Sequence, residues 1–152
     1  MIQPAFSFIE VSRAFDASAD AVFKHWSDPE TRVRWETPAG SGMSYSKFDS
    51  REGGQERVEI TANGQSVGHM DQFIRVMRDN VLVAEVTGVF GGSVGMVMLV
   101  TLQVTPEGQG CILKGTSQVV DLGGRDVTGE HTAGWNMMID NFAKDFAEHG
   151  AE

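Results

Sequence analysis

The sequence is poor in cysteine and in long apolar runs. Its 152 residues include a single cysteine, Cys111, so no disulfide can form within the chain, which suits a reducing compartment. No run approaches the roughly 18 apolar residues that a membrane span needs. Residues 1–13 have no basic start followed by an apolar stretch, so we infer no secretion signal. We therefore expect a cytoplasmic protein that does not enter a membrane.

Basic residues are also scarce. Lys and Arg number 12 against 21 Asp and Glu, which gives a net charge of −9. Nucleic acids and anionic membrane surfaces attract proteins through local positive charge, so we expect neither as a partner. Arg32 and Arg34 are the nearest approach to a basic patch, and we interpret them as part of a solvated helix face. We expect no cofactor and no metal site, because four histidines lack paired ligand spacing: His25, His69, His131 and His149.

The first part of the chain predicts one strand followed by two short helices. Residues 6–15 are rich in aromatic and β-branched side chains, which is typical of a strand. Ser18 can cap a helix, and Asp28 with Pro29 can begin a second one that ends near Trp35. The apolar positions of the first helix share one face: Ala19, Val22, Phe23 and Trp26.

Six strand-like segments follow, and a long helix ends the chain. Short turns between consecutive strands predict an antiparallel sheet. The segments are 43–49, 55–62, 67–77, 80–88, 94–105 and 111–120. From about residue 127 to 149 the pattern is helical, with one apolar face: Trp135, Met138, Ile139, Phe142 and Phe146. We predict an α+β fold over residues 1–152 as a single domain, in which a curved antiparallel sheet of six to seven strands grips the C-terminal helix.

Several residues in their order along the chain resemble a known superfamily. The markers are Arg13, Phe15, Val22, Phe23, Trp26, Asp28, Pro29, Trp35, Phe48, Asp49, Gly53, Gly54, Gly134 and Trp135. Together they resemble the START-like helix-grip superfamily, also called SRPBCC. Within it, the sequence is most similar to the bacterial family named after the activator of the ninety-kilodalton heat-shock protein's ATPase.

The resemblance implies a cavity between sheet and helix that takes an apolar or amphipathic small molecule. It implies no single chemistry, because fold and function separate readily. Relatives include lipid carriers, polyketide cyclases, a sacrificial antibiotic-resistance protein and co-chaperone domains. Where many relatives carry a bulky residue and a histidine on the last strand, this chain has Gly115 and Ser117. This departure implies a thinner cavity wall and the loss of any chemistry that depends on that histidine.

Strand alternation predicts which side chains face the helix. In residues 94–105, the inward set is Met96, Met98, Val100, Leu102 and Val104. In residues 67–77, we expect the inward set to be Met70, Gln72, Ile74 and Val76.

Two interpretations are open for which side chains of residues 81–86 face the helix. The family pattern places Val81, Val83 and Glu85 inward, whereas plain alternation allows Leu82, Ala84 and Val86. A buried Glu85 would need a partner or a proton. It would then be the best group for orienting a ligand or for acid–base chemistry. In the other interpretation, the Glu85 side chain is exposed to solvent.

Residues 91–95 fit the pattern G-x-S-x-G of hydrolase nucleophiles. That motif requires a strand before the serine and a helix after it, and here a strand pattern follows. We therefore interpret Ser93 as part of a flexible glycine loop that gates an opening. We expect Cys111 to be a small buried side chain without reactive character.

The leading functional hypothesis is a module that binds a hydrophobic or aromatic small molecule. The expected contact residues are Trp26, Trp35, Phe48, Met70, Gln72, Glu85, Met96, Met98, Ser117, Trp135, Met138 and Phe142. One alternative is a cyclase or hydrolase in which Glu85 or His131 moves protons. Another is a co-chaperone-like interaction domain. A homodimer through the last helix or an edge strand is a further expectation.

Overall fold

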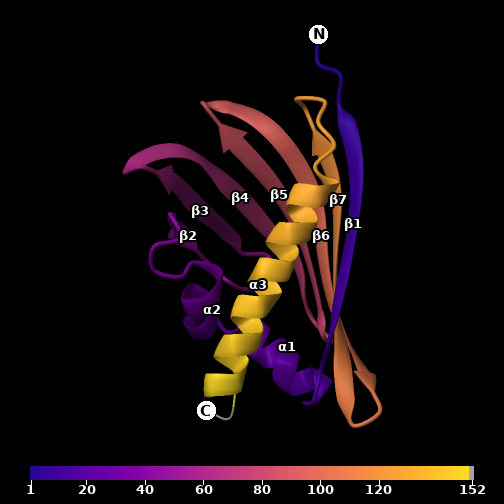
Figure 1. The fold of residues 1–152 in the computed structure, drawn as a ribbon. Coiled ribbons are helices and arrows are strands. Elements are labelled where there is room, and N and C mark those ends of the chain that lie inside the picture. The colour runs from indigo at the N-terminus through magenta and orange to yellow at the C-terminus, as the bar shows by residue number, and fades with distance from the viewer. Residues whose placement is uncertain (151–152) are drawn as a thin grey trace.

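The computed structural model describes residues 1–150, which form one antiparallel sheet and three helices (Figure 1). The strands are β1 (Ala5–Phe15), β2 (Met43–Phe48), β3 (Gln55–Ala62), β4 (Gln65–Arg78), β5 (Val81–Phe90), β6 (Ser93–Glu107) and β7 (Gly110–Asp121). The helices are α1 (Ala19–Ser27), α2 (Pro29–Glu36) and α3 (Thr128–His149). The seven strands lie in the order β1-β7-β6-β5-β4-β3-β2. The predicted α+β helix-grip fold is confirmed.

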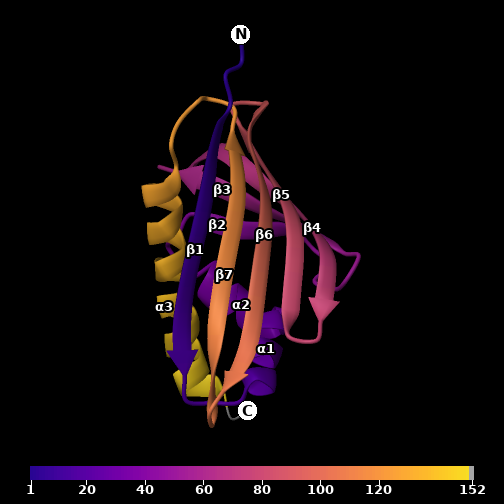
Figure 2. The same cartoon turned by 90° about the vertical axis from the view of Figure 1, so that its right-hand side faces the viewer.

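The sheet curves, and α3 crosses its concave inner face while α1 and α2 close the lower end (Figure 1). Figure 2 shows the opposite, outer face of β1, β7 and β6, with the helices behind or beside the sheet. Within residues 1–150, no helix combines the length and the apolar character that crossing a bilayer requires.

Local chemistry fixes where the elements begin and turn. The Ser18 hydroxyl accepts a hydrogen bond from Ala21 N at 3.1 Å and caps α1. Asp28 caps α2 by accepting from Glu30 N at 2.9 Å, with Pro29 in the first turn. The β3–β4 hairpin turns at Asn63 and Gly64, which have positive φ angles of 53° and 76°. Tight hairpins require such angles, and asparagine followed by glycine tolerates them best.

An aromatic cluster fills the space where the three helices meet. The rings of Trp26 and Trp35 lie 4.4 Å apart, and Phe142 lies 4.8 Å and 5.3 Å from them. All three side chains are buried, and Phe15 and Phe146 extend the cluster toward the end of α3. The lower half of α3 therefore packs on solid core.

Plain alternation describes β5, and the family pattern there is wrong. Leu82, Ala84 and Val86 are buried, whereas the Glu85 side chain is 53% exposed and pairs with Arg75. On β6 the predicted inward set is confirmed, with Leu102 and Val104 buried and Met98 and Val100 half-buried on the same face.

The inward placement of Val76 is wrong because β4 carries a bulge. The pairing with β5 shifts between Ile74 and Val76, so that Met77 lies opposite the buried Leu82. One extra residue in a strand reverses the alternation beyond it. Met77 consequently packs on the core in place of Val76.

Helix α3 is fixed to β7 by Trp135. A Cβ placed on Gly115 would lie 2.6–2.9 Å from three atoms of the Trp135 ring, so only glycine leaves room for the indole. Trp135 Nε1 donates to the Ser117 hydroxyl at 2.8 Å in a buried hydrogen bond. The thinner cavity wall implied at Gly115 is therefore absent, because the indole occupies that space.

Apolar side chains also lie on the outer face. Phe6 and Phe8 of the edge strand β1 are 77% and 60% exposed. Val97 and Leu99 of β6 are exposed on the same face, two strands away. The expected homodimer stays a prediction.

The glycines at 115 and 134 give a matched test of how α3 docks. Gly115→Ala forces the Trp135 ring to move and should lower the free energy of unfolding by about 1–3 kcal/mol. Gly134 lies in α3 with open space around it, so Gly134→Ala should raise the free energy of unfolding by up to about 1 kcal/mol. Urea unfolding of both variants measures these changes. Equal effects at the two positions would contradict this description of the Trp135 contact.

Candidate functional site

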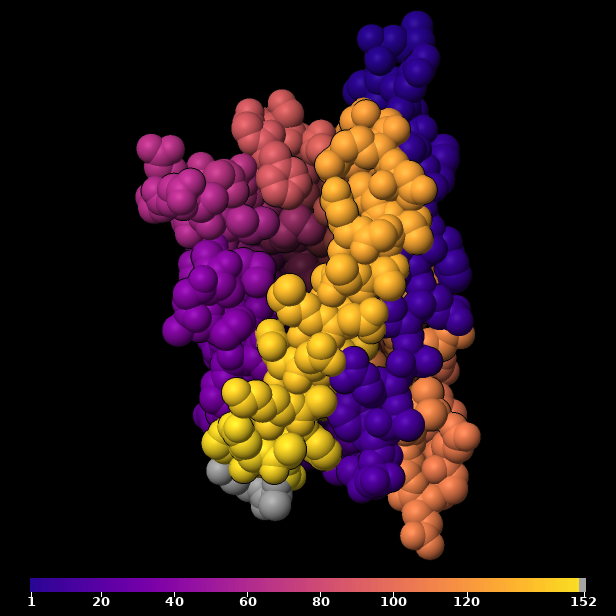
Figure 3. All heavy atoms as spheres, in the orientation of Figure 1, coloured from indigo at the N-terminus to yellow at the C-terminus, as the bar shows by residue number. Residues whose placement is uncertain are grey.

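The inner face of the sheet is closed only where the helices lie on it. Leu102, Val104 and Leu113 are buried there. Toward β3, β4 and β5 the inward side chains become half-exposed, and Figure 3 shows the surface hollowed between α3 and these strands. We call this hollow the recess. Strand register assigns to its sheet wall Val58, Ile60, Gly68, Met70, Gln72, Phe90, Met98 and Val100.

The rim of the recess is an aromatic ring that rests on glycines. A Cβ on Gly68 would lie 2.7 Å from the Phe90 ring, and one on Gly88 would lie 3.0 Å from it. Met70 and Met96 lie beside the same spot, 3.2 Å and 3.3 Å from the Gly88 position. Phe90 itself is 43% exposed. The rim thus presents aromatic and thioether surface, which adapts to ligands of varied shape.

Helix α3 supplies the opposite wall. His131, Trp135 and Met138 recur at intervals of four and three residues, which places them on one helix face. His131 and Met138 are half-buried. Burial lowers the pKa of His131, which favours the neutral imidazole at neutral pH.

A buried ionic cluster closes the recess at α2. The Arg32 side chain is 3% exposed, so its predicted place on a solvated helix face is wrong. Its guanidinium contacts both oxygens of Glu56, at 2.7 Å and 3.0 Å, and the Glu36 carboxylate at 2.7 Å. Gln72 Nε2 donates to Glu56 Oε1 at 2.7 Å. These contacts fix α2 to β3 and β4.

The remaining partners of Arg32 complete the cluster. Its two terminal nitrogens also donate to Ser50 Oγ and Tyr45 OH, each at 2.9 Å. Burial disfavours the charged guanidinium, but Glu36 and Glu56 outweigh this effect and raise the pKa of Arg32. Burial also raises the pKa of Tyr45 well above its ordinary value. The cluster is therefore a permanently charged unit whose guanidinium N–H groups all have acceptors.

A second buried ionic group ties the three helices together. His25 Nε2 lies 2.8 Å from Asp145 Oδ2, and Arg34 Nε donates to Asp145 Oδ1 at 2.8 Å. The hydrogen bond from Arg34 holds the pKa of Asp145 below its usual range. The rings of Phe142 and Phe146 lie 5.6 Å and 5.2 Å from the imidazole. This histidine–carboxylate pair therefore has a structural role in the helix junction.

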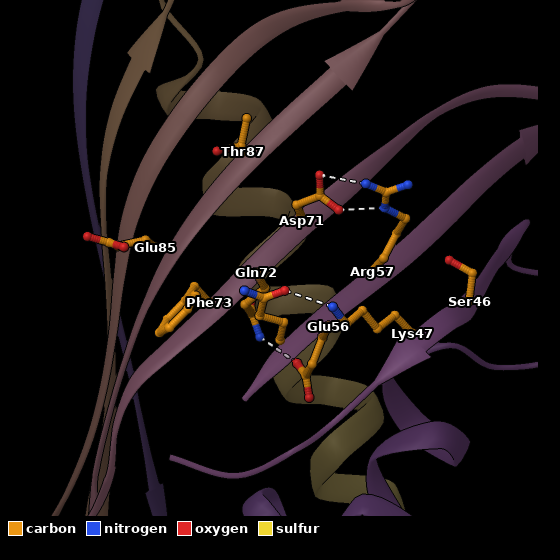
Figure 4. Close-up of a pocket in the computed structure, with 10 residues that line it drawn as sticks. Ser46, Lys47, Glu56, Arg57, Asp71, Gln72, Phe73, Glu85 and Thr87 are labelled. Atoms are coloured by element: carbon orange, nitrogen blue, oxygen red, sulfur yellow. Dashed lines mark hydrogen bonds and ion pairs between the residues drawn. The ribbon is translucent and has the colours of Figure 1, made fainter. Parts of the chain in front are cut away.

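Glu85 lies on the opposite face of the sheet from the recess. It lines an outer groove of about 590 Å³ together with Arg57, Asp71 and Phe73 (Figure 4). Glu56 and Gln72 also border this groove, although strand register places both on the face of the buried Val86. Arg57 donates to both Asp71 oxygens, at 2.6 Å and 3.1 Å, and thereby lowers the pKa of Asp71. Because the sheet separates them, Glu85 and His131 cannot act on one bound molecule.

The other candidate contact residues divide between core and recess. Trp26, Trp35 and Phe142 belong to the aromatic cluster, and Trp135 and Ser117 form the buried pair on β7. Phe48 is half-buried against the Arg32 guanidinium. Trp35 Nε1 is buried without an acceptor among residues 1–150. The recess brings together the half-exposed candidates Met70, Gln72, Met98 and Met138.

The fold also shows the surroundings of Ser93 and Cys111. Ser93 begins β6 directly after a two-glycine turn, so the helix that a hydrolase nucleophile requires does not follow it. Cys111 is buried as expected, and burial raises the pKa of its thiol. Among residues 1–150, no three His, Cys, Asp or Glu side chains are grouped as a metal ion requires.

Sequence reasoning missed Phe90, Tyr45 and Glu56. Phe90 ends a strand beside two glycines, and the glycines at 68, 88 and 95 in three neighbouring strands were a signal for a ring lying on the sheet. Glu56 alternates with Val58 and Ile60 along β3, which would have placed it on the inner face.

Comparison with known families gives one match. The model of the family described as "Activator of Hsp90 ATPase homolog 1-like protein" matches residues 16–147. No curated protein matches the sequence.

Solved structures with the same fold cover nearly the whole chain. An uncharacterized protein from Rhizobium leguminosarum is 22% identical, with a TM-score of 0.86 over 98% of this chain and 99% of its own. A protein from Rhizobium loti is 26% identical, with a TM-score of 0.83 over 94% and 99%. Norcoclaurine synthase from Thalictrum flavum, in complex with dopamine and hydroxybenzaldehyde, is 15% identical, with a TM-score of 0.71 over 96% and 89%.

The Asp145 junction predicts a defined acid response. Because its pKa is lowered in the fold, Asp145 stabilises the protein above the ordinary carboxyl pKa of about 4, and this stabilisation is lost as the pH falls through the folded value. Asp145→Asn should lower the free energy of unfolding at pH 7 by about 2–3 kcal/mol. The difference from wild type should shrink below about pH 4.

Asp140→Asn is the matched control, because Asp140 pairs with Arg13 on the exposed side of the same helix. Asp140→Asn should change the free energy of unfolding by less than about 1 kcal/mol. Thermal unfolding across the pH range measures both variants. A difference for Asp145→Asn that does not change with pH would contradict the assignment.

Proposed function

This chain belongs to the family of Activator of Hsp90 ATPase homolog 1-like proteins, and we propose that it binds an apolar or aromatic small molecule in the recess. The sheet wall and Met138 of α3 would supply the contact area. The family description refers to the activation of a chaperone ATPase, and the co-chaperone alternative stays a prediction for this chain. Its cytoplasmic location is likewise part of the proposal, in keeping with a single buried cysteine.

The main support for this proposal is the set of half-exposed apolar side chains on the inner face of the sheet. The inner face of the sheet is mostly apolar, yet Met70, Met98 and Val100 remain half-exposed on it while their neighbours Ala84 and Val86 are buried. Apolar surface gains about 25 cal/mol per Å² when it is removed from water, so this uncovered wall favours an apolar occupant. Concave apolar sites with few polar groups are typical of small-molecule binding.

The fold supports the same conclusion by likeness. Norcoclaurine synthase shares this fold and was solved with two small aromatic molecules, dopamine and hydroxybenzaldehyde. A protein of this fold can therefore bind small aromatic molecules.

An enzymatic alternative rests on His131. It is the titratable side chain on the helix wall of the recess, and its lowered pKa keeps the imidazole neutral and able to accept a proton. Glu85 has no part in this alternative, because it lies on the outer face.

The binding proposal predicts a face-specific effect of a new charge. The neutral dye N-phenyl-1-naphthylamine should bind wild-type protein with a rise in its fluorescence. Met70→Glu places a carboxylate on the recess wall and should weaken binding at least about tenfold. The matched change Val97→Glu, on the exposed outer face, should leave the affinity unchanged. Equal affinities for the two variants, with both folded by circular dichroism, would show that the dye binds elsewhere.

A further inference from the structure

Gln72 is the polar side chain that strand β4 places on the recess wall, between Met70 and Ile74. Its Nε2 donates to Glu56 at 2.7 Å, which fixes the orientation of the carboxamide (Figure 4). The amide oxygen is then turned away from Glu56, and no group among residues 1–150 donates to it within hydrogen-bonding distance. A half-buried acceptor is thus open to a donor from a bound molecule.

The charges around Gln72 disfavour an anion. The cluster contains two carboxylates, Glu36 and Glu56, against the single guanidinium of Arg32. Every N–H group of Arg32 already has a protein acceptor, so none remains for the carboxylate of a ligand. An anionic head group at this place would be repelled and left without donors.

The strand register sets the length of the site. Gln72 lies four residues along β4 from Gly68, on which the Phe90 ring rests. Four residues of extended strand span about 13 Å. Between these two points the wall is formed by Met70. On β6, Met96 lies level with Met70 across Gly88, and Met98 lies level with Gln72 across Val86. The site therefore combines an apolar wall of that length with an acceptor at its inner end.

We propose that the molecule bound in the recess is an amphiphile whose head group donates a hydrogen bond to the Gln72 carboxamide oxygen and carries no negative charge. Alcohols, phenols and amines fulfil this condition, whereas carboxylates do not. Its apolar body lies along Met70 and Met98 and ends at Phe90. This inference rests on the proposed function and adds the chemical class of the ligand.

Three ligands with the same ten-carbon chain separate the head groups. Decan-1-ol, decylamine and decanoate are titrated at neutral pH against protein that is loaded with N-phenyl-1-naphthylamine, and dye release is measured by fluorescence. The alcohol and the amine should displace the dye, and decanoate should bind at least about tenfold more weakly. This comparison uses the wild-type protein and depends on no variant.

Gln72→Met tests the assigned acceptor, because it keeps the length of the side chain and removes the oxygen. The affinity for decan-1-ol should fall about threefold to tenfold, which corresponds to the loss of one hydrogen bond, while the dye affinity stays unchanged. Gln103→Met, on the exposed outer side of β6, is the matched control and should change neither. Thermal unfolding verifies that both variants are folded.

The outcomes separate this inference from the proposed function. If decanoate binds as well as the alcohol, or if Gln72→Met leaves the alcohol affinity intact, the head-group assignment is wrong while binding in the recess stands. If neither the dye nor any of the three amphiphiles binds, the proposed function fails and this inference fails with it.

Discussion

One helix has to cover the concave face of a seven-stranded sheet, and it is too narrow to do so. Strands lie about 4.8 Å apart, so seven of them span roughly 29 Å, whereas a helix with its side chains is about 10–12 Å wide. Helix α3 is held along β1 and β7 by Trp135 and at its lower end by the aromatic cluster. Helices α1 and α2 close the bottom of the sheet (Figure 1). The apolar inner surface that remains, on β3 to β6, is the recess.

Keeping such a surface open requires that its borders be rigid. Arg32 is buried with Glu36 and Glu56, and taking these charges out of water is costly unless each finds partners. Here the guanidinium reaches two carboxylates, Ser50 and Tyr45, so the cluster holds α2 against β2 and β3. At the far end, the Phe90 ring lies on Gly68 and Gly88. The recess is bounded by charge at one end and by aromatic surface at the other.

Many elements of this fold could be predicted because they depend on the local periodicity of apolar and polar residues. The order of elements, the caps at Ser18 and Asp28 and the inward face of β6 all follow from patterns within a few residues. The errors lie where distant residues decide. The local sequence predicts that Arg32 is exposed. It is buried because the fold places Glu56 of β3 beside it. The bulge that displaces Val76 depends on pairing with β5. For Glu85, plain alternation gave the right face, and the pattern taken from the family was wrong. The recess itself depends on the width of the sheet relative to α3, which no local pattern records.

An apolar molecule in the recess would lie between Met70, Met98 and Met138, and the methyl groups of these residues report on it directly. The chain has eight methionines, which can be labelled with carbon-13 at the methyl group and followed by NMR during titration with decan-1-ol. We predict that the signals of these three shift, while those of Met137, exposed on α3, and Met77, on the closed part of the core, stay in place. A shift confined to Met137, or no shift of the three at saturating ligand, would show that the recess is not the binding site.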